Sequence, residues 1–110
     1  MPIMKSGPQE PIVVPGDYAQ EGDATFYGPG FDGRKTASGE VFDQNALTAA
    51  HPSLPFGTKV MVTNLANHKQ VIVRINDRGP FTQAIIDLSY GAAREIGLLK
   101  TGRVKIQALR

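Results

Sequence analysis

Two β-branched segments that lie close together in the chain constrain its fold most. Residues 59–63 (KVMVT) and 70–75 (QVIVRI) carry aliphatic residues at alternate positions, and only the polar stretch NLANHK separates them. Alternation with a period of two is typical of strands that bury one face, and a short polar connection is typical of an antiparallel hairpin. The sequence therefore predicts a β-hairpin over residues 59–75.

Other segments extend this pattern. Ala24 and Phe26 precede a Gly-Pro-Gly turn, residues 84–86 are a short apolar run, and residues 103–109 alternate over their whole length. Each is a candidate strand. A sheet of short strands exposes unpaired edges, and closing it into a barrel removes them. We therefore expect a mainly β fold, a small β-barrel.

Only one segment has helical character. Ser89 is a suitable N-cap for residues 90–96, and Gly97 suits the position that follows the last turn. We expect the barrel to carry this one short helix.

The first part of the chain differs from the rest. Residues 1–21 contain Pro2, Pro8, Pro11 and Pro15 and only one short apolar run, IVV. This composition is typical of a flexible tail or linker, so the sequence places the barrel domain at residues 22–110.

Composition and spacing exclude several classes of protein. The 12 Lys and Arg and 10 Asp and Glu leave a net charge of +2, which does not indicate a nucleic-acid partner. No apolar run approaches the roughly 20 residues of a transmembrane helix, and no signal-peptide core is visible. The chain has no Cys, and its two His residues lack metal-ligand spacing, so no metal and no cofactor are expected. Without a G-x-S-x-G or phosphate-loop motif, carboxylate chemistry remains.

Asp77 directly follows the second strand of the predicted hairpin. Continued alternation places Asp77 on the same face as Val71, Val73 and Ile75, the predicted core face, at the mouth of the barrel. Burial there would raise the pKa of its carboxyl and the adjacent Arg78 would lower it, so the sequence leaves the balance open. Capping of the Gly-Pro turn that follows is the alternative role for Asp77.

Three further polar residues lie in Gly- or Pro-containing loops. Glu40 and Asp43 adjoin a short apolar piece and either face a cleft or form a solvated acidic turn. His51 lies between small residues and a proline, where it either takes part in the chemistry or makes a structural hydrogen bond.

Seven motifs, in this order and spacing, closely resemble the rare lipoprotein A family of double-psi β-barrel proteins, and the resemblance covers essentially all of residues 22–110. The motifs are Gly22-Asp-Ala-Thr-Phe-Tyr-Gly28, Gly33-Arg-Lys-Thr-Ala-Ser-Gly-Glu40, Leu47-Thr-Ala-Ala-His51, Leu54-Pro-Phe-Gly-Thr58, Val62-Thr-Asn-Leu65, Asn76-Asp-Arg-Gly-Pro-Phe81 and Ile86-Asp-Leu-Ser-Tyr90. The resemblance implies a six-stranded double-psi β-barrel. For active members it implies lytic transglycosylase activity on peptidoglycan glycan strands that lack stem peptides.

The resemblance also implies residue roles. The family's catalytic acid falls on Asp77, and its other conserved cleft residues fall on Glu40 and His51, with Asp43 in the same stretch. The reaction cleaves the β-1,4 bond between N-acetylmuramic acid and N-acetylglucosamine. As a hypothesis, Asp77 protonates the glycosidic oxygen and then accepts the proton of the muramyl C6 hydroxyl, which closes on C1 to give a 1,6-anhydro product. Glu40 or Asp43 would raise the pKa of Asp77 by like-charge repulsion.

The remaining binding candidates are aromatic or basic. Tyr27 and Phe26 are candidates for sugar stacking or, alternatively, for the core, and Arg78 joins them beside the acid. Phe26 stands where the family usually has Trp, which keeps a stacking face but lacks the indole N–H. The family's lipid-attachment Cys and glycan-binding repeats do not occur in these residues.

Two other functions remain open at this stage. A glycan-binding barrel would hold the same strands without cutting them, and a protein-binding barrel of the protease-inhibitor kind would use the loop at residues 28–35. The resemblance places the protein in the cell envelope, periplasmic or secreted, as a monomer.

Overall fold

The computed structural model describes residues 18–27 and 29–109. Most of the tail predicted for residues 1–21 lies outside these residues. Within them the chain forms six strands and one α-helix, and no helix there is long and apolar enough to cross a membrane. The elements are β1 (Ala19–Tyr27), the short 3-10 helix η1 (Pro29–Phe31), β2 (Thr48–Ala50), β3 (Lys59–Asn64), β4 (Gln70–Asp77), β5 (Ile86–Ser89), α1 (Tyr90–Glu95) and β6 (Gly102–Ala108).

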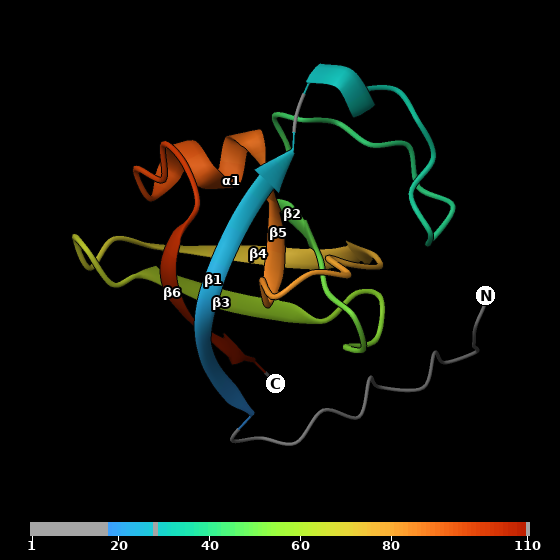
Figure 1. Cartoon of the computed structure of the whole chain (residues 1–110). Coiled ribbons are helices and arrows are strands. Elements are labelled where there is room, and N and C mark those ends of the chain that lie inside the picture. The colour runs from blue at the N-terminus through green and yellow to red at the C-terminus, as the bar shows by residue number, and fades with distance from the viewer. Residues whose placement is uncertain (1–17, 28, 110) are drawn as a thin grey trace.

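The six strands close into a barrel in the order β1-β5-β2-β4-β3-β6. The β1–β5 and β2–β4 pairs are parallel, and the other four pairs are antiparallel. Figure 1 shows α1 and the long segment between β1 and β2 at the same end of the barrel, the end at which β1 finishes. The predicted mainly β barrel with one short helix is confirmed.

The predicted hairpin and helix are also confirmed. Val60 and Val62 of β3 lie opposite Val73 and Val71 of β4. Ser89 caps α1, since its side chain accepts the backbone N–H of Ala92. These signals are local in the chain, so the sequence pattern is sufficient to reveal them.

Three strands differ from the sequence-based expectation. β5 covers Ile86–Ser89 rather than residues 84–86. β2 is a strand although the sequence shows only a short apolar piece there, because all three of its residues are buried and no alternation marks it. β1 pairs with β6 from Ala19 on, so residues 19–21 take part in the barrel and not only in a tail.

The core fills the inside of the barrel with aliphatic side chains from every strand. Gly22 of β1 faces inward, where an added Cβ would lie 2.7 Å from Ile85, so the close packing of that isoleucine requires glycine. Burial of such aliphatic groups is the main stabilising contribution to a domain of this size. The fully buried large aliphatic residues are Val60, Val62, Val73, Ile75, Ile86, Leu88, Ile96, Val104 and Ile106.

The predicted orientation of Asp77 is wrong. Ala49 pairs with Ile75, but the next residue, Ala50, pairs with Asp77, so Asn76 is an extra residue in β4. Such a bulge reverses the alternation of the side chains that follow it. Asp77 therefore lies on the outer face of the barrel instead of sharing the core face of Ile75.

Candidate active site

The register of four neighbouring strands aligns two carboxyl groups on the outside of the barrel. Asp87 of β5 pairs with Thr25 of β1 on one side and with Ala50 of β2 on the other. Ala50 in turn pairs with Asp77 of β4. The row across the sheet is therefore Thr25, Asp87, Ala50 and Asp77, with only a methyl group between the two acidic positions.

Three hydrogen-bond donors face the carboxyl group of Asp77. Its Oδ1 accepts the backbone N–H groups of Ala37 and Arg78, both at 2.9 Å. The phenol of Tyr27 donates to Oδ2 over 3.5 Å. Because an ionised carboxylate only accepts hydrogen bonds, a site that offers it donors alone suits the charged form.

Tyr27 forms the aromatic wall beside Asp77. Its ring stacks on Phe42 at 4.6 Å between centroids and meets the edge of Phe31 at 5.5 Å. Burial, then the charges of Asp77 and Asp87, raise the pKa of the Tyr27 phenol above its ordinary value, so it remains a donor. These groups border a pocket of about 250 Å³, which is lined by Tyr27, Phe31, Arg34, Lys35, Thr36, Phe42 and Asp77.

Asp87 is the residue that the sequence did not single out, although it lies in one of the quoted motifs. It is partly buried, and its Oδ1 accepts a 2.9 Å hydrogen bond from the Thr25 hydroxyl. Burial raises the pKa of the Asp87 carboxyl, and the nearby charge of Asp77 raises it further, against the opposing effect of Thr25. The sequence signal that could have identified Asp87 is an acidic residue between two aliphatic residues, Ile86 and Leu88.

Glu40 lies in an ion pair. Its carboxylate accepts both terminal nitrogens of Arg74, at 2.7 and 2.6 Å, and the amide of Asn76 at 3.2 Å. The hydrogen bonds to Arg74 are the main reason why the pKa of Glu40 lies below its ordinary value. The charge of Glu40 is therefore compensated by Arg74.

The Glu40–Arg74 pair fastens the loop that carries Ala37. Within that loop, Lys35 and Val41 form a β-bridge, and the N–H of Ala37 reaches Asp77. The pair thus connects Arg74 of β4 to the loop whose backbone N–H binds the carboxyl of Asp77. The Glu40–Arg74 pair therefore positions the loop beside Asp77.

We expect Arg74→Met to impair function more than stability. The pair is more than a third exposed, so its loss should change the free energy of unfolding by only about 0–1 kcal/mol. Displacement of the loop should lower cleavage by up to about 10²-fold. Because the folded-state pKa of Glu40 is depressed, its stabilising effect is present above its ordinary pKa and is lost as pH falls through the folded value. Urea unfolding from neutral to acid pH, compared with glycan cleavage, tests both.

His51 is buried, and both of its ring nitrogens have partners. Nδ1 accepts the backbone N–H groups of Ser53 and Leu54 at 3.1 Å, so Nε2 carries the proton and contacts the Tyr18 hydroxyl at 3.2 Å. Its backbone N–H donates to the carbonyl of Asp77 at 3.2 Å. The imidazole shapes the turn after β2, and its contact with the acidic site runs through the backbone.

We expect His51→Asn to fold and to remain active, because the Asn Oδ1 takes the place of Nδ1 as acceptor. Burial, then the charge of Arg78, lowers the pKa of His51, so wild-type stability falls as pH drops below 6.5 and the unfolded chain alone gains a proton. The free energy of unfolding of the His51→Asn variant should lack this dependence on pH. Chemical unfolding between about pH 7 and pH 5 measures it. A cleavage loss of about 10²-fold or more at constant stability would instead support proton transfer by His51.

The structure places the remaining candidates away from the pocket or at its margin. Asp43 is exposed and caps its own turn through the N–H of Asn45. Phe26 lies on the face of β1 opposite Tyr27 and packs against the core. Arg78 donates to the carbonyls of residues 51 and 54 and stacks on Phe56, 4.1 Å from the ring centroid. Arg78 thus orders the loop after β2.

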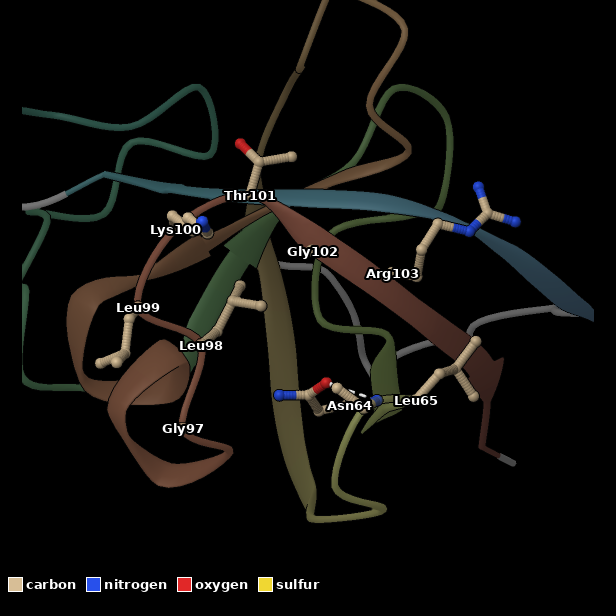
Figure 2. A pocket seen from close by; sticks show the side chains of 10 residues that line it. Asn64, Leu65, Gly97, Leu98, Leu99, Lys100, Thr101, Gly102 and Arg103 are labelled. Carbon is tan, nitrogen blue, oxygen red and sulfur yellow. Dashed lines mark hydrogen bonds between the residues drawn. The ribbon is translucent and has the colours of Figure 1, made fainter.

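A second pocket lies at the other end of the β3–β4 hairpin. It has a volume of about 480 Å³, and Figure 2 shows the ten residues that line it, from the turn after β3 and from residues 97–103. Its charged side chains are Lys100 and Arg103, and it contains no carboxyl or imidazole. The larger pocket lacks a carboxyl, so the carboxyl chemistry predicted from the sequence directs attention to the pocket beside Asp77.

The closed six-stranded barrel, with its two parallel and four antiparallel strand pairs, agrees with the double-psi β-barrel class expected from the sequence. A family model described as lytic transglycolase matches residues 19–108, and the chain belongs to this family. The resemblance seen in the sequence motifs is thereby confirmed.

Relatives with assigned names share this barrel. The probable endolytic peptidoglycan transglycosylase RlpA of Synechocystis is 67% identical over 82 residues, which are 74% of this chain and 26% of that protein. The endolytic peptidoglycan transglycosylase RlpA of Campylobacter jejuni is 52% identical over 98 residues, which are 88% of this chain and 36% of that protein. The chain thus spans about a quarter to a third of these relatives.

Among solved structures, the Streptomyces papain inhibitor has the same fold. The two superpose with a TM-score of 0.69 at 21% identity, covering 91% of this chain and 98% of the inhibitor. A likeness at this identity shows the barrel architecture alone.

Proposed function

We propose that this chain is the catalytic barrel of a peptidoglycan lytic transglycosylase. The relatives that match it at 67% and 52% identity bear that name, and the chain belongs to the lytic transglycolase family. The proposed substrate is the glycan strand, in the form that lacks stem peptides. Family membership and the site chemistry support the same activity.

The observation that carries the proposal is the environment of Asp77. Three donors hold its carboxyl at the edge of a pocket whose wall is the Tyr27–Phe42 stack. Sugars bind to aromatic faces through their C–H surfaces, and a fixed carboxyl beside such a face is suited to proton transfer at a glycosidic bond.

The proposed reaction needs no water. The glycosidic oxygen takes a proton from a carboxylic acid as its bond to C1 of the N-acetylmuramic acid breaks. The C6 hydroxyl oxygen of the same sugar forms a new bond to C1, and its proton passes to a carboxylate. The products are a 1,6-anhydro end and a free N-acetylglucosamine hydroxyl, so atoms and charges balance. One carboxyl serves both transfers in turn, or two carboxyls divide them.

The direct test is mass spectrometry of glycan strands stripped of stem peptides and incubated with the chain. New 1,6-anhydro-muramyl ends support the proposal. Reducing ends formed by hydrolysis contradict it. Binding of the strands without any cleavage would make the barrel a glycan-binding module instead.

The substrate defines the proposed location. Peptidoglycan lies in the bacterial cell envelope, so we propose that the barrel acts there, as a periplasmic or secreted monomer. Light scattering of the purified chain tests the monomer, and fractionation of cells that express the native protein tests the location.

A further inference from the structure

The site contains a second carboxyl, Asp87, to which the sequence analysis assigned no role although it lies within the Ile86–Tyr90 motif. In the sheet, Ala50 of β2 pairs with Asp77 of β4 on one side and with Asp87 of β5 on the other. The side chain of Asp87 lies on the same face as that of Thr25, its neighbour in register, because the Thr25 hydroxyl donates to Asp87 Oδ1 at 2.9 Å. The row of residues that contains Asp77 continues through Ala50 to this face. Asp87 therefore lies in the same row as Asp77, two strands away, and next to the pocket that Asp77 lines.

The surroundings of the two groups differ in a way that separates their roles. Asp77 accepts from two backbone N–H groups at 2.9 Å and from the Tyr27 phenol, so its contacts suit a carboxylate. Asp87 has the hydroxyl of Thr25 as its one hydrogen-bond donor among the described residues. A hydroxyl can give or take a hydrogen bond, so Thr25 accommodates a protonated acid as well as a carboxylate.

We infer that Asp87 is a second catalytic carboxyl, which donates the proton to the glycosidic oxygen while Asp77 accepts the proton of the C6 hydroxyl. The inference rests on the proposed transglycosylase function. In this division the Asp87 O–H bond breaks as the leaving oxygen gains the proton, and Asp77 gains the proton that the attacking hydroxyl releases. One proton transfer from Asp77 to Asp87 then restores the resting pair.

The electrostatic surroundings support the same division. Burial and the charge of Asp77 raise the pKa of Asp87. From β1 the site receives Thr25 and the neutral phenol of Tyr27, from β2 only Ala50, and from β4 Asp77. Arg78 is engaged with carbonyl groups of the loop after β2. A carboxyl with a raised pKa can keep its proton and act as a general acid.

The test compares a natural leaving group with one that needs no proton. We expect Asp87→Asn to lower cleavage of glycan strands by about 10²-fold or more, because the leaving oxygen loses its proton donor. With a nitrophenyl β-glycoside of N-acetylmuramic acid, whose phenolate leaves unprotonated, the variant should approach the wild-type rate. Asp77→Asn should fail on both substrates, because each still needs a base for the C6 hydroxyl.

Two further variants distinguish catalysis from structural support. Thr25→Val removes the hydrogen bond that lowers the pKa of Asp87, so the alkaline limb of the pH–rate profile should move to higher pH. Asp23→Asn changes an exposed carboxyl of the same strand, whose one ion pair is with Arg103 at 3.7 Å, and should leave both rates unchanged. Thermal unfolding of each variant confirms that the barrel is intact.

The outcomes separate this inference from the proposed function. An inactive wild-type chain contradicts the function. An active wild type with an equally active Asp87→Asn variant overturns the inference, as does a loss that is the same on both substrates. Carboxyl-carbon NMR of the wild type provides a readout without turnover, in which the pKa of Asp87 should lie above the ordinary value of an aspartate. A pKa of Asp87 at or below that value would also overturn the inference.

Discussion

Asp77→Asn should lower glycan cleavage by about 10²–10⁴-fold while leaving the fold intact, because it removes the carboxyl that general acid–base catalysis requires. The Asn side chain keeps an oxygen in the place of Oδ1, which accepts the N–H groups of Ala37 and Arg78 at 2.9 Å. The loop that these bonds hold should therefore stay in position. The measurement is the initial rate of 1,6-anhydro product formation, with circular dichroism of both proteins.

The exposed Asp23 on β1 provides the matched control, since Asp23→Asn makes the same chemical change outside the site. A rate for Asp77→Asn within a few-fold of the Asp23→Asn rate would contradict the role proposed for Asp77. So would unfolding of the Asp77→Asn variant at the assay temperature, since the effect would then be structural.

Ile75→Ala should have the largest effect on stability among the single changes considered. Ile75 is fully buried in the barrel core, whereas Ile72, three residues earlier on the same strand, is 46% exposed. Removing a buried aliphatic side chain leaves a cavity that costs about 2–5 kcal/mol. For a domain of this size each kcal/mol lowers Tm by roughly 4–8 °C.

Ile72→Ala removes the same atoms from the outside of the barrel. We expect it to change the free energy of unfolding by less than about 0.5 kcal/mol, as is usual for surface substitutions. Urea denaturation of the two variants tests the difference. Equal destabilisation would mean that the inner and outer faces of β4 are not those described, and the placement of Asp77 by the bulge would be wrong as well.

Several parts of the candidate site were predictable from the sequence. The sequence leaves two roles open for Asp77, catalytic acid or turn cap, and two for Tyr27, sugar stacking or core. The structure brings these two residues into contact beside one pocket. Phe26 was assigned two alternatives, and its place against the core follows from its alternation with Tyr27 along β1. The catalytic and binding roles of all these candidates stay predictions. The contacts that the structure gives Glu40, Asp43, His51 and Arg78 are with the protein itself.

Other parts could not be predicted, because they depend on which strands are neighbours. Asp87 is a candidate site residue because its strand lies between the strands of Thr25 and Ala50, and Ala50 pairs with Asp77. These residues come from four different strands of the chain. In the sequence, Arg74 is a polar residue of a strand with no visible partner. Its pairing with Glu40 depends on the path of the loop that carries Glu40. No periodicity or motif reports a pairing of this kind.

The class of this protein follows from patterns that are local in the chain. Period-two alternation specifies β3, β4 and β6, and the Ser89 and Gly97 signals delimit α1, because strand alternation and helix capping act over a few residues. The tertiary structure alone decided which face Asp77 occupies. A single unpaired residue, Asn76, shifts the register against β2 and moves the carboxyl from the core side to the outer side, where it meets Tyr27 and the row that contains Asp87. A bulge is a property of two paired strands, so neither strand's sequence reveals it.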